Sequence, residues 1–100
     1  MEVEIKKISV VMCTYNGARF IREQLDSILN QTYPIYELIV QDDCSTDETV
    51  EIVKEYQVRF PQVDIKIYIN EKNLGFNRNF LTAIQKAKGE YIAIADQDDI

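Results

Sequence analysis

The sequence contains no histidine, and this absence excludes several classes of enzyme. Without an imidazole there is no Ser-His-Asp or Cys-His catalysis and no histidine-ligated metal centre. Glycine is scarce as well, with three residues in the chain. Gly17, Gly75 and Gly89 lie too far apart to form a GxGxxG turn or a P-loop. Dinucleotide binding and P-loop nucleotide binding through these motifs are therefore excluded.

Basic residues, cysteines and long apolar runs are also few. Eleven Lys and Arg stand against 17 Asp and Glu, giving a net charge of −6 that argues against nucleic acid as a partner. Cys13 and Cys44 form no CxxC motif, so free, partly buried thiols are expected. No apolar run approaches the roughly 20 residues of a membrane span, and residues 1–7 do not resemble a signal peptide. These features predict a cytoplasmic chain.

The chain does contain a regular alternation of strand-like and helix-like segments. Its 100 residues, 46% of them hydrophobic, suit one domain over residues 1–100 with one core. Apolar, strand-like runs cover residues 8–12, 36–40, 65–69 and 91–95. Between them lie helix-period stretches, one of which carries Phe76, Phe80, Ala83 and Ile84 on one face. This order predicts an α/β fold with βαβ crossovers and a mostly parallel sheet.

Local signals refine this prediction. The run at 65–69 alternates polar and apolar residues and is expected at a sheet edge, whereas the other three runs are expected to be buried. Ser45 followed by Glu48 predicts a capping box at the start of the second helix. Gly89 is placed to end the third helix.

Polar residues follow each predicted strand, where an open parallel sheet binds ligands. The segments are CTYNG (13–17), QDDCSTDET (41–49), NEKNLGFNRN (70–79) and ADQDD (95–99). Asp42, Asp43, Asp96, Asp98 and Asp99 crowd this edge, and packed carboxylates repel one another unless a cation neutralises them. Oxygen-only ligands favour Mg²⁺ or Mn²⁺.

Four blocks in this order resemble the N-terminal part of inverting family 2 glycosyltransferases with the GT-A fold. They are ISVVMCTYNG (8–17), LIVQDDCSTDET (38–49), NLGFNRNF (73–80) and KGEYIAIADQDD (88–99), the last with a DxD-type metal motif. The resemblance implies a Rossmann-like half of that fold. The combination is most similar to bacterial rhamnosyltransferase-type members that build cell-surface polysaccharide.

The resemblance also implies roles for individual residues. Tyr15 stacks on the pyrimidine of the donor, Asp43 accepts a hydrogen bond from its ring N–H, and Arg78 contacts the donor. Asp98 and Asp96 hold the metal, with Asp96 also near the ribose. Thr14 and Asn16 complete the expected nucleotide-sugar site, Asn16 as a loop-shaping residue. Structural alternatives stay open: a rim aromatic for Tyr15, a surface ion pair for Arg78, hydrogen bonds to loop amides for Asp42, and an Asp-stabilised turn for Asp96 and Asp98.

The family's general base and acceptor site lie downstream of the DxD motif, so both are expected beyond residue 100. The resemblance then implies a UDP- or dTDP-sugar donor and, in the full enzyme, a saccharide or lipid-linked acceptor and a cytoplasmic or membrane-peripheral location. A chain of these residues is expected to transfer no sugar alone and to self-associate through exposed apolar surface. Two alternatives stay open: a non-catalytic nucleotide- or partner-binding module, and a receiver-type signalling domain. The second is disfavoured because its acid pair would follow the first strand, not the second.

Overall fold

A computed structural model describes residues 7–30 and 34–96 of the chain. Strands and helices alternate along the sequence, as predicted. The elements are β1 (Ile8–Thr14), α1 (Ala18–Leu29), β2 (Glu37–Asp42), α2 (Thr49–Arg59), β3 (Ile65–Ile69), α3 (Phe76–Gln85) and β4 (Tyr91–Asp96). The strands match the predicted apolar runs to within two residues at each end.

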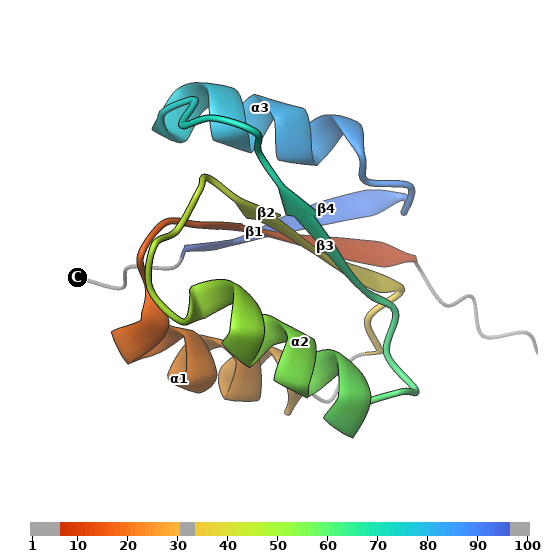
Figure 1. Ribbon diagram of the computed structural model, residues 1–100. Helices are drawn as coiled ribbons and strands as arrows, with labels where there is room; N and C mark the ends of the chain where they lie inside the picture. Colours follow the sequence, from red (N-terminus) through yellow and green to blue (C-terminus); the bar gives the residue numbers. More distant parts are fainter. Residues whose placement is uncertain (1–6, 31–33, 97–100) are drawn as a thin grey trace, which may run out of the picture.

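The four strands form one parallel sheet in the order β3-β2-β1-β4. Helices α1 and α2 cover one face of this sheet and α3 covers the other (Figure 1). The register sets Thr14 of β1 beside Asp42 of β2, and Cys13 beside Asp96 of β4. The carboxyl ends of these three strands therefore meet, and the predicted α/β parallel fold is confirmed.

The two faces of the sheet are packed to different depths. Between the sheet and α1/α2 lies the larger core, which includes Met12, Leu25, Leu38, Val40 and Tyr56. Under α3 the buried apolar residues are Val11, Ile39 and Ala83. The smaller core follows from the single helix on that face, which covers less of the sheet. Phe76, the first residue of the apolar face predicted for α3, is 69% exposed, so the prediction that it packs on the sheet is wrong.

In the described part of the chain, β3 and β4 are the two edge strands of the sheet. The expected edge position of β3 is confirmed. The expected burial of the fourth strand is wrong for the described residues, because β4 forms the other edge. Ile92 and Ile94 are 43% and 54% exposed there. An all-apolar run is typical of a buried strand, but it does not show how many neighbours that strand has.

Two local predictions are also wrong. Helix α2 begins at Thr49, and Ser45 makes no capping box with Glu48 because its hydroxyl bonds Asp42 instead. Cys44 has a φ of 64°, which turns the chain away from a helical start at this point. The N–H at the start of α2 is instead bonded by Asp47, whose carboxylate accepts from Thr49 N at 3.0 Å.

Gly89 does not end α3, which stops at Gln85. It lies in the connection to β4, where a Cβ atom would come within 2.6 Å of the Lys7 carbonyl oxygen and of Ser9 Oγ. Its role is therefore close packing against β1. Cys13 and Cys44 are half-buried thiols that form no disulfide, as expected. Over the described ranges, no helix has the length and apolar character that crossing a bilayer requires.

Candidate functional site

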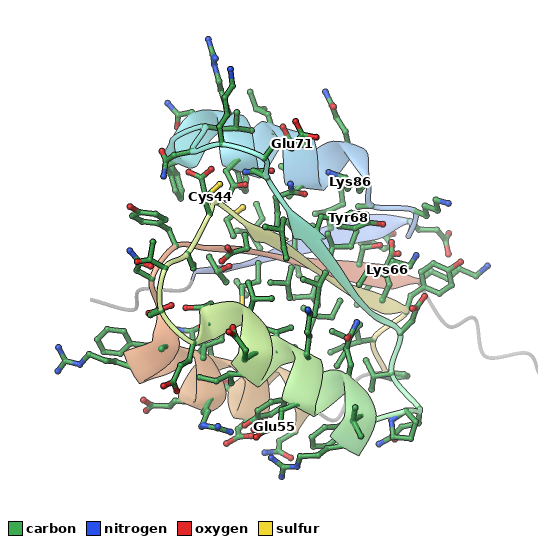
Figure 2. All side chains as sticks on the ribbon, in the orientation of Figure 1. Cys44, Glu55, Lys66, Tyr68, Glu71 and Lys86 are labelled. Carbon is green, nitrogen blue, oxygen red and sulfur yellow. The ribbon has the colours of Figure 1, made fainter. Side chains whose placement is uncertain are left out.

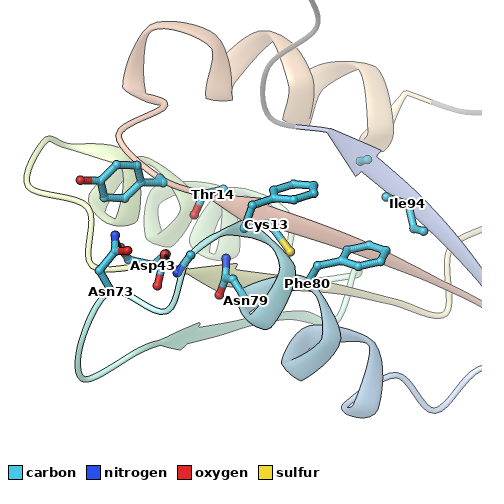
Figure 3. A pocket seen from close by; sticks show the side chains of 11 residues that line it. Cys13, Thr14, Asp43, Asn73, Asn79, Phe80 and Ile94 are labelled. Atoms are coloured by element: carbon cyan, nitrogen blue, oxygen red, sulfur yellow. Dashed lines mark hydrogen bonds between the residues drawn. The ribbon is translucent and has the colours of Figure 1, made fainter.

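A pocket of about 600 Å³ opens at the carboxyl ends of β1 and β4, between the sheet and the start of α3 (Figure 3). Its polar wall is formed by side chains from three separate segments, among them Tyr15, Asp43, Asn73 and Asn79. Its other wall is apolar and is lined by Cys13, Phe76, Phe80, Ile94 and Ala95. The pocket lies at the carboxyl ends of the strands, where the sequence predicted ligand binding.

Asp43 is the buried anion of this pocket, with a side chain 4% exposed. Its Oδ1 accepts the N–H of Leu74 at 2.7 Å and Nδ2 of Asn70 at 2.9 Å. Its Oδ2 accepts the N–H of Gly75 at 3.0 Å. Burial alone would raise the pKa of Asp43, but these three donors outweigh burial and hold the pKa below its ordinary value. Asp43 is therefore an ionised acceptor at the pocket wall.

The neighbouring Asp42 has a different environment. Its carboxylate accepts the Thr14 hydroxyl at 2.6 Å and both the backbone N–H and the hydroxyl of Ser45, at 2.8 and 2.6 Å. Asp42 is fully buried and is absent from the pocket lining. Its hydrogen bonds hold the loop after β2 against β1, which is the structural alternative for this residue.

The three residues predicted after β1 occupy different positions. Tyr15 is 50% exposed and lines the pocket with Asp43. Thr14 also borders the pocket, but its hydroxyl is directed to Asp42. Asn16 has a φ of 49° and does not line the pocket; its Oδ1 accepts the N–H of Thr46 at 2.7 Å. Asn16 thus joins two loops, in agreement with a loop-shaping role.

The remaining predicted residues lie around the opening or outside the described part of the chain. Arg78 is exposed on α3 and does not line the pocket. Asp96 ends β4, directly after the pocket residues Ile94 and Ala95. Asp98 and Asp99 lie outside the described residues, so the predicted metal pair stays a prediction. Within residues 7–30 and 34–96, no group of three potential metal ligands occurs.

Sequence reasoning missed a buried polar group behind Asp43. Asn79 is 3% exposed, and its side chain accepts from Asn70 at 2.7 Å and donates to the Gln41 carbonyl at 3.1 Å. The available signal was an asparagine on the helix face that also carries Phe76, Phe80 and Ala83, where a polar residue needs a buried partner.

The pocket thus combines an aromatic ring, a buried anionic acceptor and an apolar wall. A flat heteroaromatic group with an N–H on its edge matches this combination, since the ring can stack on Tyr15 and the N–H can reach Asp43. The positive groups that a free phosphate would need do not line the pocket among the described residues. A phosphate group bound here would need a metal ion or backbone donors.

Comparison with known proteins gives matches over almost all of the chain. The family model described as glycosyl transferase family 2 matches residues 9–100. A poly(ribitol-phosphate) beta-glucosyltransferase of Bacillus spizizenii is 44% identical over 96 residues, which are 93% of this chain and 15% of that protein. The curated relatives that match are longer, and the chain spans 27% of the first of them.

Solved structures of longer glycosyltransferases share the fold. The mannosyltransferase PcManGT from Pyrobaculum calidifontis, in complex with GDP-Man and Mn²⁺, superposes with a TM-score of 0.87 at 32% identity, covering 95% of this chain and 28% of that one. Residues 1–349 of Staphylococcus aureus TarS in complex with UDP-GlcNAc give a TM-score of 0.83 at 36% identity, covering 92% and 26%. The expected Rossmann-like half of the GT-A fold is thereby confirmed.

Proposed function

The chain belongs to glycosyl transferase family 2, and we propose that its pocket binds the nucleotide of a nucleotide-diphosphate sugar. The observation that carries the proposal is the pairing of Tyr15 and Asp43 in one pocket. The pyrimidine stacks on the Tyr15 ring, and its N3–H donates to Asp43. Uracil and thymine both present this N–H, so a UDP- or dTDP-sugar is the proposed donor.

The Asp43 carboxylate can accept one more hydrogen bond, from the N3–H of the base. Each carboxylate oxygen can accept two hydrogen bonds. Among the bonds of the described residues, Oδ1 accepts two and Oδ2 accepts one, from Gly75. The second acceptor position of Oδ2 is therefore available to a ligand N–H. Because the lowered pKa keeps Asp43 ionised at neutral pH, this bond is charge-assisted.

A divalent metal completes the proposed donor site. The strand β4 lines the pocket with Ile94 and Ala95 and ends at Asp96, and Asp98 follows two residues later in the sequence. Carboxylate oxygens suit Mg²⁺ or Mn²⁺, and Asp98 with Asp96 would hold the ion. When bound, the metal supplies positive charge that stabilises the leaving diphosphate. Thr14, Asn16 and Arg78 are the further proposed donor contacts.

In the full enzyme, the sugar is transferred to an acceptor hydroxyl with inversion at the anomeric carbon. A carboxylate beyond residue 100 removes the proton of that hydroxyl, and the nucleoside diphosphate leaves from the opposite side. The acceptor is a saccharide or a lipid-linked saccharide in cell-surface polysaccharide synthesis, as the relatives' names support. Transfer by a rhamnosyltransferase-type enzyme in the cytoplasm remains the finer part of the proposal.

Calorimetric titration with UDP, dTDP and GDP, each with and without Mn²⁺, tests the proposal. We expect UDP or dTDP to bind more tightly than GDP, because the pocket is proposed to fit one pyrimidine ring between Tyr15 and Asp43. Equal binding of GDP and UDP would remove the pyrimidine assignment. Failure of all three nucleotides to bind, with and without Mn²⁺, would remove the function.

A further inference from the structure

A chain of side-chain hydrogen bonds runs from Lys86, at the end of α3, to Asp43 in the pocket. Lys86 Nζ donates to Gln41 Oε1 at 2.8 Å, and Gln41 Nε2 donates to Asn70 Oδ1 at 2.5 Å. Asn70 Nδ2 then donates to both Asp43 Oδ1 and Asn79 Oδ1, at 2.9 and 2.7 Å. This set of five residues, called the polar relay below, joins β2, α3 and the loop after β3.

Burial makes the relay a costly feature unless every member is paired. Gln41, Asp43 and Asn79 are 2%, 4% and 3% exposed. All buried side-chain nitrogen and oxygen atoms of the described residues have hydrogen-bond partners. Lys86 lies between α3 and the sheet with its Nζ 4.6 Å from the centre of the Tyr68 ring (Figure 2).

The direction of donation in the relay is fixed at its ends. The Lys86 ammonium group can only donate, so Gln41 must present its oxygen there and its NH₂ group to Asn70. The Gln41 backbone carbonyl can only accept, so Asn79 must present its NH₂ group to it and its oxygen to Asn70. Asn70 is thereby left with one orientation, in which its NH₂ group faces Asp43.

We propose that Gln41, Asn70, Asn79 and Lys86 are positioning residues that lock Asp43 as an acceptor and so select nucleobases with an N–H on the edge facing it. The inference rests on the proposed function, because it assumes that a nucleobase reaches Asp43. Asn70 and the Leu74 N–H fill Oδ1, so that the acceptor position left on Oδ2 faces only donors. Cytosine presents a bare N3 nitrogen on this edge and is rejected, whereas uracil presents N3–H.

The other titratable groups near Asp43 do not replace this control. Asp42 is bonded by Thr14 and Ser45 and is absent from the pocket. The Cys44 thiol donates to the Asn70 carbonyl at 2.9 Å. Tyr15 lines the pocket from the end of β1, and Asp96 ends β4. Among the described residues, Lys86 is the positively charged side chain that the relay connects to Asp43.

Gln41→Glu is the sharpest test, since it changes one NH₂ group to an oxygen at nearly constant shape. The carboxylate introduced at position 41 accepts from Lys86 but cannot donate to Asn70. Asn70 then turns its NH₂ group toward this carboxylate and no longer donates to Asp43 and Asn79. We expect UDP affinity to fall about tenfold because Asp43 is no longer held in place, and the preference for UDP over CDP to shrink. The pKa of Asp43, measured by carboxyl ¹³C NMR, is expected to rise by about one unit.

Gln57→Glu is the matched control. Gln57 lies on α2, donates to the Ile65 carbonyl at 2.7 Å and is remote from the relay. It makes the same chemical change at a partly buried position, so UDP binding and the pKa of Asp43 are expected to stay at wild-type values. Lys86→Met is the second variant, in case the substitution of Gln41 prevents folding. It frees the Gln41 amide to rotate, and the UDP-over-CDP preference is expected to fall.

Three outcomes separate the relay from the proposed function. Loss of UDP preference and a raised Asp43 pKa in Gln41→Glu or Lys86→Met, with Gln57→Glu unchanged, supports the relay. Wild-type preference and an unchanged Asp43 pKa in both relay variants overturn the relay and leave the proposed function standing. If the wild-type protein binds no nucleotide, the proposed function fails and so does the selection of bases.

Discussion

Asp42 and Asp43 are adjacent carboxylates with the same chemistry and separate uses. Asp42 belongs to β2 and bonds Thr14 and Ser45, which fixes the loop after the strand. Asp43 is the next residue, where the strand has ended, and its carboxylate bonds the backbone of residues 74–75. One acid therefore stabilises the loop, and the other lines the pocket.

Replacing Asp43 should therefore weaken nucleotide binding. In Asp43→Ala the pyrimidine N3–H loses its acceptor, and an unpaired buried polar group costs about 1–3 kcal/mol, or about tenfold or more in affinity. Titration calorimetry with UDP measures this loss. Asp64→Ala removes an exposed carboxylate before β3 and serves as control. Equal UDP affinity of the Asp43 variant and wild type, in folded protein, would contradict the assignment.

The metal prediction concerns Asp96, the last residue of β4, and Asp98. If the DxD segment is extended, as we propose, its two acids would point to one side and would together repel a diphosphate unless a cation is bound. UDP binding should depend strongly on Mg²⁺ or Mn²⁺, and Asp98→Asn should remove most of that dependence.

Asp99→Asn is the matched control for that substitution, because it removes the same charge one residue along the chain. Its effect on metal-dependent binding should be smaller. Titrations of UDP in the presence of a chelator give the reference. Chelator-insensitive binding by the wild-type protein would overturn the metal site, while Asp43 and Tyr15 could still hold the base.

At the scale of the elements, Gly89 and Gly75 are constrained in different ways, Gly89 by close packing and Gly75 by its backbone angle. At Gly89 a Cβ would meet the Lys7 carbonyl oxygen and Ser9 Oγ at 2.6 Å, so Gly89→Ala must push the α3–β4 connection away from β1. At Gly75 an added Cβ would meet no atom within 4 Å, but its φ of 86° is rarely adopted by other residues. Denaturant unfolding should show a loss of about 1–3 kcal/mol for each variant.

The two glycine variants differ in what else they change. Gly75 donates its N–H to Asp43, so Gly75→Ala should also weaken UDP binding. Gly89 lies at the opposite end of the strands, next to the start of β1, so Gly89→Ala should lower stability with little change in UDP affinity. The reverse pattern would contradict these roles.

Glu37 joins several elements at the amino ends of the strands and should make stability pH-dependent. Fully buried in β2, it accepts from Lys66 Nζ at 2.8 Å, Ser9 Oγ at 2.6 Å and Lys88 N at 2.6 Å. Burial would raise the pKa of Glu37, but these donors outweigh burial and lower it below 4.5. A lowered pKa gives stability that is present above the unfolded-state pKa and lost as pH falls through the folded-state pKa.

Glu37→Gln should lower the free energy of unfolding by about 2 kcal/mol at pH 7, since Lys66 and the N–H of Lys88 lose a charged acceptor. Because the wild type loses its advantage as Glu37 becomes protonated, the difference between the two proteins should narrow below pH 4.5. Urea unfolding at a series of pH values measures this narrowing. A constant difference from pH 7 to pH 3 would show that the Glu37 charge contributes nothing.

The elements themselves could be predicted from the sequence because they depend on short-range periodicity. Ile21, Leu25 and Ile28 recur at helical spacing in the sequence and are buried on α1. The capping of α2 and the packing of Gly89 could not be predicted from periodicity. The Ser45 hydroxyl bonds Asp42, three residues earlier, whose carboxylate also accepts from Thr14 of β1. Gly89 meets β1, a strand some 80 residues earlier in the chain.

For the molecule as a whole, the location of the site could be predicted from the sequence, but the hydrogen bonds of the polar relay could not. Parallel topology brings the carboxyl ends of β1, β2 and β4 together whatever their side chains are, so Tyr15 and Asp43 could be expected to meet. The polar relay depends on amide side chains from β2, α3 and a loop meeting under one helix. No periodic signal marks such a meeting, although Asn79 does share a helix face with Phe76 and Ala83 in the sequence.

The last prediction concerns the open edge of the sheet. In the part of the chain that the structure describes, β4 pairs with a strand on one side only, and Tyr91, Ile92 and Ile94 are 53%, 43% and 54% exposed. Exposed apolar edge strands template pairing with another chain. The edge strand β3 instead carries Lys66, a charged residue that disfavours such pairing. We therefore expect the 100-residue chain to self-associate through β4 as its concentration rises.

Sedimentation velocity over a concentration series tests this expectation. Ile92→Lys places a charge on the β4 edge and should shift the chain toward monomer, because pairing would bury an uncompensated ammonium group. Val58→Lys is the matched control, since Val58 is 81% exposed on α2, away from that edge. It adds the same charge and should leave association at the wild-type level. A wild-type chain that stays monomeric at high concentration would show that this edge does not drive association.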